Sequence, residues 1–140
     1  MKVNGMPGWV LGMAGFAVAA VLGVPVLFAE PTAEELRDTI RQYIAQQQSA
    51  LGSFTLPDPR DQGKLRTLDL VRVHERVGKT GDYYYSCTDM KDAATGDELD
   101  LDFDVADAGK ERKGVAVRIH KDNGKPRYTY DDNDNLIPLN

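Results

Sequence analysis

Hydrophobic and polar residues alternate without exception from Leu99 to Val105, with an aspartate at every even position. A period of two residues is typical of a β-strand that has one apolar and one polar face. A helix is excluded because its step of roughly 100° per residue would scatter both kinds of side chain around the axis. The stretch therefore predicts a central strand whose odd positions face the core, while Asp100, Asp102 and Asp104 line an open, polar face.

A second pattern precedes this strand, in which apolar residues recur at helical spacing from Leu36 to Leu51, interrupted only by Gln47. That spacing places them on one stripe of a helix. Thr32 and Glu35 have the spacing of a capping box, which begins a helix. Gly52 follows the stripe and can adopt the left-handed conformation that ends one. The sequence thus predicts an amphipathic helix that covers the apolar face of a sheet.

The rest of the chain contains short alternating segments separated by turn residues. Strands joined by short turns pair in sequence order. Asn123-Gly124 is the strongest hairpin signal, and Pro126 beside it suits an edge strand because it lacks an amide donor. We therefore expect an α+β fold in which one N-terminal helix packs on one face of a four- to five-stranded antiparallel meander. The expected strands of the meander are 68–77, 83–88, 99–105, 115–120 and 127–130, and a brief edge strand is expected before them at 53–56.

This order of one helix followed by a meander resembles the cystatin-type arrangement. The resemblance rests on element order alone, since the chain carries no motif of the cysteine-protease inhibitors. It therefore implies a fold and no function.

Residues 9–28 contain no charged side chain and follow Lys2. An apolar run of this length with a positive start is typical of an export signal or of a membrane anchor. Phe28-Ala29-Glu30 offers a small residue for cleavage, although Leu27 fits the cleavage rule poorly. We expect residues 1–29 to be a signal peptide or an uncleaved anchor, with a buried core helix as a further alternative. Residues 30–140 would then form a single periplasmic or extracellular domain, in contact with the membrane only through this segment.

Composition narrows the partners of this domain. The 140 residues carry a formal net charge of −5 with basic residues dispersed among acidic ones, which argues against nucleic acid. The chain has one cysteine, Cys87, so it cannot form an internal disulfide, and it has no Cys/His spacing typical of zinc. We expect Cys87 to be a small buried apolar group, and we expect no cofactor.

The open polar face is the candidate binding surface. If the turn after Val105 closes symmetrically, Asp102 lies opposite Arg118 and Asp100 opposite His120. Such cross-strand pairs of opposite charge often only fix register and keep a sheet soluble. The side chains that we expect on this face are those of Arg72, His74, Tyr84, Asp100, Asp102, Arg118 and His120.

Three functions remain open. The first is a non-catalytic module that binds a protein or peptide of the cell envelope through this face. The second is a small-molecule enzyme in which Asp100 orients His120 as a base at the mouth of a cone-shaped pocket. The third is a calcium-stabilised envelope module. No nucleophile elbow, phosphate loop or redox pair favours catalysis.

Two metal arrangements fit the sequence poorly. His74 and His120 are expected three strands apart, about 14 Å at 4.8 Å per strand, which is too far for one zinc ion. Asp131, Asn133 and Asn135 have the spacing of an EF-hand loop, but Leu136 stands where that loop needs glycine. That segment instead predicts an Asn/Asp turn between two short strands.

Overall fold

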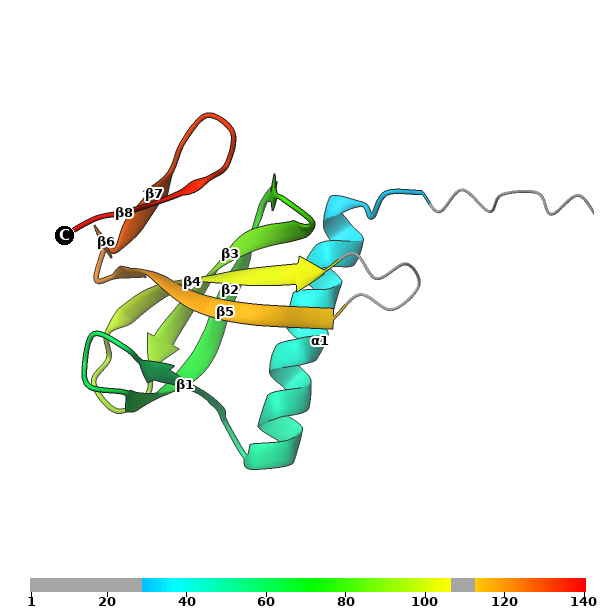
Figure 1. Cartoon of the computed structure of the whole chain (residues 1–140). Helices are drawn as coiled ribbons and strands as arrows, with labels where there is room; N and C mark the ends of the chain where they lie inside the picture. The colour runs from blue at the N-terminus through cyan, green and yellow to red at the C-terminus, as the bar shows by residue number, and fades with distance from the viewer. Residues whose placement is uncertain (1–28, 107–112) are drawn as a thin grey trace, which may run out of the picture.

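The computed structural model describes residues 29–106 and 113–140, which contain one helix and eight strands (Figure 1). Apart from Ala29, the predicted signal or anchor at residues 1–29 lies outside the described residues, and so do residues 108–112 of the turn that the sequence predicts at 108–114. In the ranges described, no helix is both long and apolar enough to cross a membrane. The elements are α1 (Ala33–Leu51), β1 (Phe54–Asp58), β2 (Lys64–Thr80), β3 (Tyr83–Asp92), β4 (Glu98–Ala106), β5 (Lys113–Asp122), β6 (Lys125–Pro126), β7 (Tyr128–Tyr130) and β8 (Leu136–Pro138).

Helix α1 has the predicted ends. The Thr32 hydroxyl accepts from the backbone amide of Glu35, and the Glu35 carboxylate accepts from the backbone amide of Thr32, which completes the capping box. Gly52 ends the helix with φ 81°, a conformation that glycine adopts without strain. The buried stripe of the helix consists of Leu36, Ile40 and Ile44.

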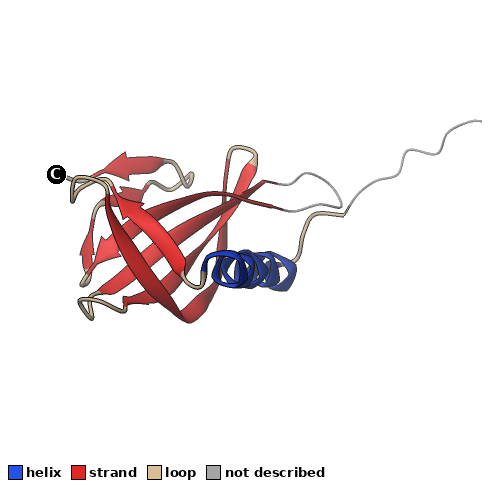
Figure 2. Cartoon of the chain, turned by 90° about the horizontal axis from the view of Figure 1, so that it is seen from below, coloured by secondary structure: helices blue, strands red, loops and turns tan. Residues whose placement is uncertain are grey.

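The sheet confirms the predicted antiparallel meander. Strands β1 to β6 lie in sequence order, and each pairs antiparallel with the next. The sheet has six strands rather than four or five, because the two-residue β6 extends it beyond β5. Figure 2 shows a strongly curved sheet with α1 along one side.

The core lies between α1 and the apolar face of the sheet. Phe103 and Leu101 are fully buried there, and the Phe103 ring contacts the rings of Tyr43 and Phe54 at centroid distances of 6.1 and 5.9 Å. Burying a side chain of this size contributes about 1.5 to 3 kcal/mol. The odd positions of β4 thus face the core, as their alternation predicts.

The C-terminal segment departs from the prediction that residues 127–130 extend the sheet. Asn123 and Gly124 do form the expected tight turn, with φ 48° and 79°. Beyond Pro126, however, β7 leaves the sheet and pairs only with β8 (Figure 1). The departure comes after Arg127, whose guanidinium donates both to Asp58 on β1 and to Asp122 on β5.

This C-terminal hairpin, β7–β8, corrects the expectation of an open polar face. It packs over the side of the sheet opposite the core, and Asp100, Asp102 and Asp104 are only 8%, 0% and 6% exposed. Strand β4 is therefore buried on both sides. The alternation predicts the side of the sheet to which each side chain points but not whether it is exposed. The hairpin that covers the polar side begins 26 residues after Asp102 in the chain.

The turn of the hairpin confirms the local interpretation of its Asn/Asp residues. The Asp131 carboxylate accepts hydrogen bonds from the backbone amides of Asn133 and Asn135 and from the Asn135 side chain. Asp134 adopts φ 59°, and its carboxylate accepts from the hydroxyl of Tyr85 on β3. The segment is an Asx-type turn whose tip is tied to the sheet.

Candidate functional site

The polar face is built mainly by β3 and β4. Direct cross-strand pairs place Asp89 opposite Asp100, Cys87 opposite Asp102, and Tyr85 opposite Asp104.

Tyr84 does not share this face. It lies opposite Val105 and belongs to the buried core. The odd-numbered residues of β3 face the polar side instead. The prediction that placed Tyr84 on the polar face is therefore wrong by one position.

A bulge in β2 brings His74 onto the face. Val73 pairs with Thr88 and Val77 with Ser86, so the three residues 74–76 stand opposite one residue of β3. The Ser86 hydroxyl lies 3.1 and 3.0 Å from the backbone oxygens of residues 74 and 76, and it can donate to either of them. His74 Nε2 lies 2.7 Å from Asp89 Oδ1.

A second bulge, in β5, sets the position of His120. Leu101 pairs with Ile119 but Asp100 pairs with Lys121, which leaves His120 as the extra residue. A bulge of this kind places two successive side chains on one side of a sheet. The predicted register of Asp102 with Arg118 is confirmed, whereas that of Asp100 with His120 is displaced by one residue.

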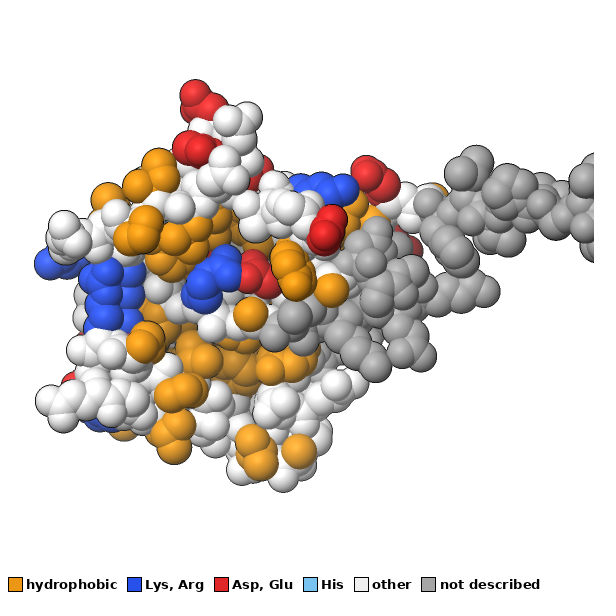
Figure 3. Space-filling view, in the orientation of Figure 1, with side chains coloured by type: hydrophobic (Ala, Val, Ile, Leu, Met, Phe, Trp, Pro, Cys, Tyr) orange, Lys and Arg blue, Asp and Glu red, His pale blue; other side chains and the backbone are white. Residues whose placement is uncertain are grey.

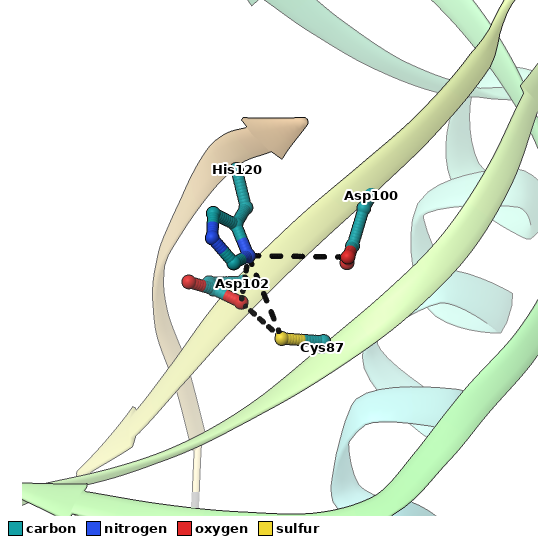
Figure 4. Close-up of side chains that lie close together, drawn as sticks. All are labelled: Cys87, Asp100, Asp102 and His120. Atoms are coloured by element: carbon teal, nitrogen blue, oxygen red, sulfur yellow. Dashed lines mark hydrogen bonds and ion pairs between the residues drawn. The ribbon is translucent and has the colours of Figure 1, made fainter. Parts of the chain in front are cut away.

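Four side chains meet between these strands, and we call them the Cys87–His120 cluster: Cys87, Asp100, Asp102 and His120 (Figure 4). Their ligand-capable atoms all lie within 4.8 Å of one another. His120 Nδ1 lies 3.8 Å from Cys87 Sγ, 3.8 Å from Asp102 Oδ1 and 3.9 Å from Asp100 Oδ2. The imidazole nitrogen thus stands at nearly equal distances from a thiol and two carboxylates.

The Asp102 carboxylate is held on both of its oxygens. Cys87 Sγ donates to Oδ1 at 2.8 Å, and the hydroxyls of Tyr128 and Tyr130 donate to Oδ2 at 2.7 and 2.5 Å. The Tyr128 ring also stacks on His120 at a centroid distance of 4.8 Å. The hairpin therefore fixes two members of the cluster.

The neighbouring Asp104 has a different environment. It receives both terminal nitrogens of Arg118, and Arg118 also donates to the Tyr130 hydroxyl. Asp104 therefore has a guanidinium partner, whereas the partners of Asp102 are neutral donors.

Asp100 is incompletely satisfied. Its side chain is 10% exposed, and its Oδ1 is buried without a hydrogen-bond partner among the described residues. Burial raises the pKa of Asp100, and the nearby His120, His74 and Lys121 act against that rise. Lys121 Nζ approaches Oδ2 at 3.5 Å. An unpaired buried oxygen is costly and marks a position where a further partner would be stabilising.

Burial also raises the pKa of the Cys87 thiol, and the adjacent Asp102 raises it further. Cys87 is half-buried and donates a hydrogen bond to Asp102, so it is not the small buried apolar group that the sequence predicts. The thiol is kept protonated at neutral pH.

A cleft of about 500 Å³ opens beside the cluster at the part of the polar face that the hairpin leaves accessible. Asp100 lies at this cleft together with Asp89, His74 and Lys121. Arg72 is exposed next to it and donates twice to Asp89. The residues that line the cleft are Val71, His74, Asp89, Met90, Lys91, Glu98, Leu99, Asp100, Lys121 and Gly124.

A more apolar groove of about 330 Å³ runs between β1, β5 and the C-terminal hairpin. Figure 3 shows hydrophobic side chains around a hollow on the face seen in Figure 1, with lysine and arginine side chains beside it. The groove is lined by Leu56, Pro57, Pro59, Arg60, Val117, Arg118, Ile119, Arg127, Tyr128, Leu136 and Pro138.

The structure brings together Asp100, Asp102 and His120 among the predicted site residues. It places His74 with Asp89 at the cleft, and it pairs Arg118 with Asp104. The sequence analysis missed five further residues of the site. Two features of the sequence could have indicated some of them: the odd-numbered positions of β3 share one face, and two tyrosines follow the Asn-Gly turn. These residues are Cys87, Asp89, Lys121, Tyr128 and Tyr130.

Comparisons with known proteins give no functional lead. No protein-family model matches the chain. No curated protein and no solved structure matches it either.

Proposed function

We propose that this chain is an exported, non-catalytic binding module that holds a protein or peptide partner in the cleft beside β4. The observation that carries the proposal is the cleft of about 500 Å³, which remains where the hairpin ends and which contains His74 and Asp100. It is within the size range of ligand sites, about 300 to 1,000 Å³. Charges of both signs line it, so it suits a polar segment better than a lipid.

The floor of the cleft supplies a recognition group. Asp100 Oδ1 has no hydrogen-bond donor among the described residues, and Lys121 stands beside Asp100 at the rim. Because this oxygen has almost no exposed surface, a partner must first turn the Asp100 carboxylate toward the cleft. A hydrogen bond from an amide, hydroxyl or amine of the partner then satisfies an acceptor that has no donor among the described residues.

The catalytic alternative lacks its predicted pair. Asp100 Oδ2 lies 3.9 Å from His120 Nδ1, which is too long for a hydrogen bond, and His120 is absent from the residues that line the cleft. The calcium alternative also lacks support, because Asp102 and Asp104 turn to different partners. Calcium needs six to eight oxygens around one point.

Site-specific cross-linking in cells tests the binding proposal. A photo-reactive amino acid at Lys91, which is exposed at the cleft, should capture a partner on irradiation. The same amino acid at Gln46, exposed on α1, is the matched control and should not. Lys121→Ala should reduce capture at position 91. Equal adducts at both positions, or none at position 91, would contradict the proposal.

Export is tested separately, by N-terminal sequencing of the chain recovered from cell envelopes. A mature chain that begins at Glu30 indicates a cleaved signal, and an intact N-terminus in the membrane fraction indicates an anchor. Recovery of the intact chain from the cytosol would contradict export.

A further inference from the structure

We propose that the Cys87–His120 cluster is a tetrahedral site for a divalent transition-metal ion of the zinc class, formed by one thiolate, one imidazole and two carboxylates. This inference goes beyond partner binding in the cleft and does not depend on it. It rests on the geometry of the four side chains and on the incompletely satisfied Asp100 carboxylate, whose Oδ2 faces His120 and whose Oδ1 has no hydrogen-bond partner among the described residues.

The distances match those of a tetrahedral site. Zinc binds sulfur at about 2.3 Å and nitrogen or oxygen at about 2.0 to 2.2 Å, so ligand atoms lie about 3.4 to 3.6 Å apart. His120 Nδ1 lies 3.8 to 3.9 Å from the other three ligand-capable atoms. Cys87 Sγ and Asp102 Oδ1, 2.8 Å apart, must separate by about 0.8 Å, and the remaining pairs lie within 4.8 Å.

The donor set is suited to this class of ion. Thiolate and imidazole select borderline-soft metals over magnesium and calcium. The ligands come from three adjacent strands, β3, β4 and β5 (Figure 4), so the sheet fixes their separation. Binding converts the Cys87 thiol to a thiolate and releases one proton to solvent. No electron is transferred.

Charge and hydrogen bonding point to the same site. Asp58 and Asp104 each receive the terminal nitrogens of an arginine. Asp102 is fully buried without such a partner, and Oδ1 of Asp100, a side chain nine-tenths buried, has no hydrogen-bond partner in the described part of the chain. A divalent cation would offset these two carboxylates, and buried charges are stable only when they are compensated.

The surroundings provide outer support for metal ligands. Tyr128 and Tyr130 donate to Asp102 Oδ2, which orients Oδ1 toward Cys87 and His120 (Figure 4). Lys121 is 41% exposed, so its ammonium can turn away from Asp100 when an ion arrives. Outer hydrogen bonds of this kind commonly change metal affinity 10- to 100-fold.

A neighbouring group, His74, Asp89 and Asp100, also has its ligand-capable atoms within 4.8 Å. It is the weaker candidate because Asp89 already accepts two hydrogen bonds from Arg72 and lies 2.7 Å from His74 Nε2. It also lacks sulfur, so the two groups give different cobalt spectra.

The test is a titration of the reduced, chelator-treated full-length chain with Co²⁺, followed by displacement with Zn²⁺. We expect one equivalent of Co²⁺ to give a sulfur-to-cobalt charge-transfer band and intense visible bands of a tetrahedral ion. Cys87→Ser should lose the charge-transfer band, and His120→Gln should weaken Zn²⁺ binding at least about 100-fold. The matched control His74→Gln should leave both unchanged.

Tyr130→Phe keeps all four ligands and should weaken Zn²⁺ binding about 10-fold, which tests the site even if Cys87→Ser fails to fold by circular dichroism. Absence of the band in folded wild-type chain would overturn the inference. So would a band that persists in Cys87→Ser or disappears in His74→Gln. The two proposals share Asp100 but have separate readouts, so failure of the cobalt titration is distinguishable from failure of cross-linking at Lys91.

Discussion

The Cys87 thiol donates a hydrogen bond to the Asp102 carboxylate at 2.8 Å, between directly opposed residues of β3 and β4. Together with two tyrosine hydroxyls on the other oxygen, this contact satisfies a carboxylate that has no exposed surface. Hydrogen bonds to a charged acceptor are about twice as strong as neutral ones. Asp102 is therefore a buried point of attachment between the C-terminal hairpin and the sheet.

Replacing this carboxylate should loosen the hairpin. Asp102→Asn keeps the shape but turns one acceptor oxygen into a donor that faces either the Cys87 thiol or the tyrosine hydroxyls. We expect the free energy of unfolding, measured with urea, to fall by about 2 to 5 kcal/mol. The control Asp132→Asn, in the exposed hairpin turn, should change it by less than about 0.5 kcal/mol. Equal effects of the two substitutions would refute this role of Asp102.

The sequence predicts this fold well wherever local patterns decide it. The capping box at Thr32, the stop at Gly52 and the alternation of β4 all depend on near neighbours in the chain, and the structure confirms them. The strand order follows because short turns join consecutive strands.

The candidate site was less predictable for three reasons. The bulges at His74 and His120 shift the register by amounts that strand alternation does not encode. The hairpin returns over the polar face and buries Asp102. The sequence also does not decide which alternate positions of β3 face the core, since residues 83–85 are all tyrosine. In the structure, the middle one, Tyr84, belongs to the core. The sequence therefore contains no motif that predicts the contact between Cys87 and Asp102.

Alkaline pH should destabilise the chain through the buried thiol. Burial raises the pKa of Cys87 in the folded state, so its stabilising contribution is complete below the unfolded pKa, about 8.5, and is lost as pH rises above that value. We expect the free energy of unfolding to decline by up to about 1.4 kcal/mol per pH unit from this group.

The substitution Cys87→Ala separates the thiol from the tyrosines. Burial likewise raises the pKa of Tyr85, Tyr128 and Tyr130, whose unfolded pKa is about 10. In the variant, the decline measured by urea unfolding should begin near that value rather than near 8.5. If Cys87→Ala and the wild type lose stability over the same pH range, the thiol has the same pKa in the folded and unfolded states, which would contradict the prediction.

Acid should act through a different group, the buried carboxylate of Asp58. Hydrogen bonds from the Arg127 guanidinium hold the pKa of Asp58 well below its ordinary value. The stability from this pair is present above the unfolded pKa of about 3.9 and is lost as pH falls toward the folded pKa. Arg127 also donates to Asp122, so one guanidinium joins β1 to β5.

Removing that guanidinium should cost about 3 to 5 kcal/mol at neutral pH, because Arg127→Met leaves a buried carboxylate short of its main partner. The midpoint of acid unfolding, followed by circular dichroism, should also move to higher pH. Arg41→Met removes an exposed arginine of α1 that pairs with Asp38, and it should cost less than about 1 kcal/mol. Similar losses in the two variants would contradict the distinction between a buried and an exposed pair.

A test of packing is available where β2 passes the tyrosine stack. A Cβ atom added at Gly78 would lie 2.4 Å from two ring carbons of Tyr85. That ring cannot easily move aside, because it stacks on Tyr130 at 4.6 Å and its hydroxyl donates to Asp134. Gly78→Ala should therefore lower the free energy of unfolding by about 1 to 3 kcal/mol.

The same substitution made in a Tyr85→Ala background should cost much less, because the clash is then absent. The difference between the two backgrounds is a coupling free energy, which a double-mutant cycle measures directly by urea unfolding. We expect this coupling to be about 1 kcal/mol or more, with Gly78→Ala less destabilising in the Tyr85→Ala background than in the wild type. A coupling near zero would mean that the Tyr85 ring swings away freely, and the hairpin would then be held to the sheet without the Tyr85–Tyr130 stack.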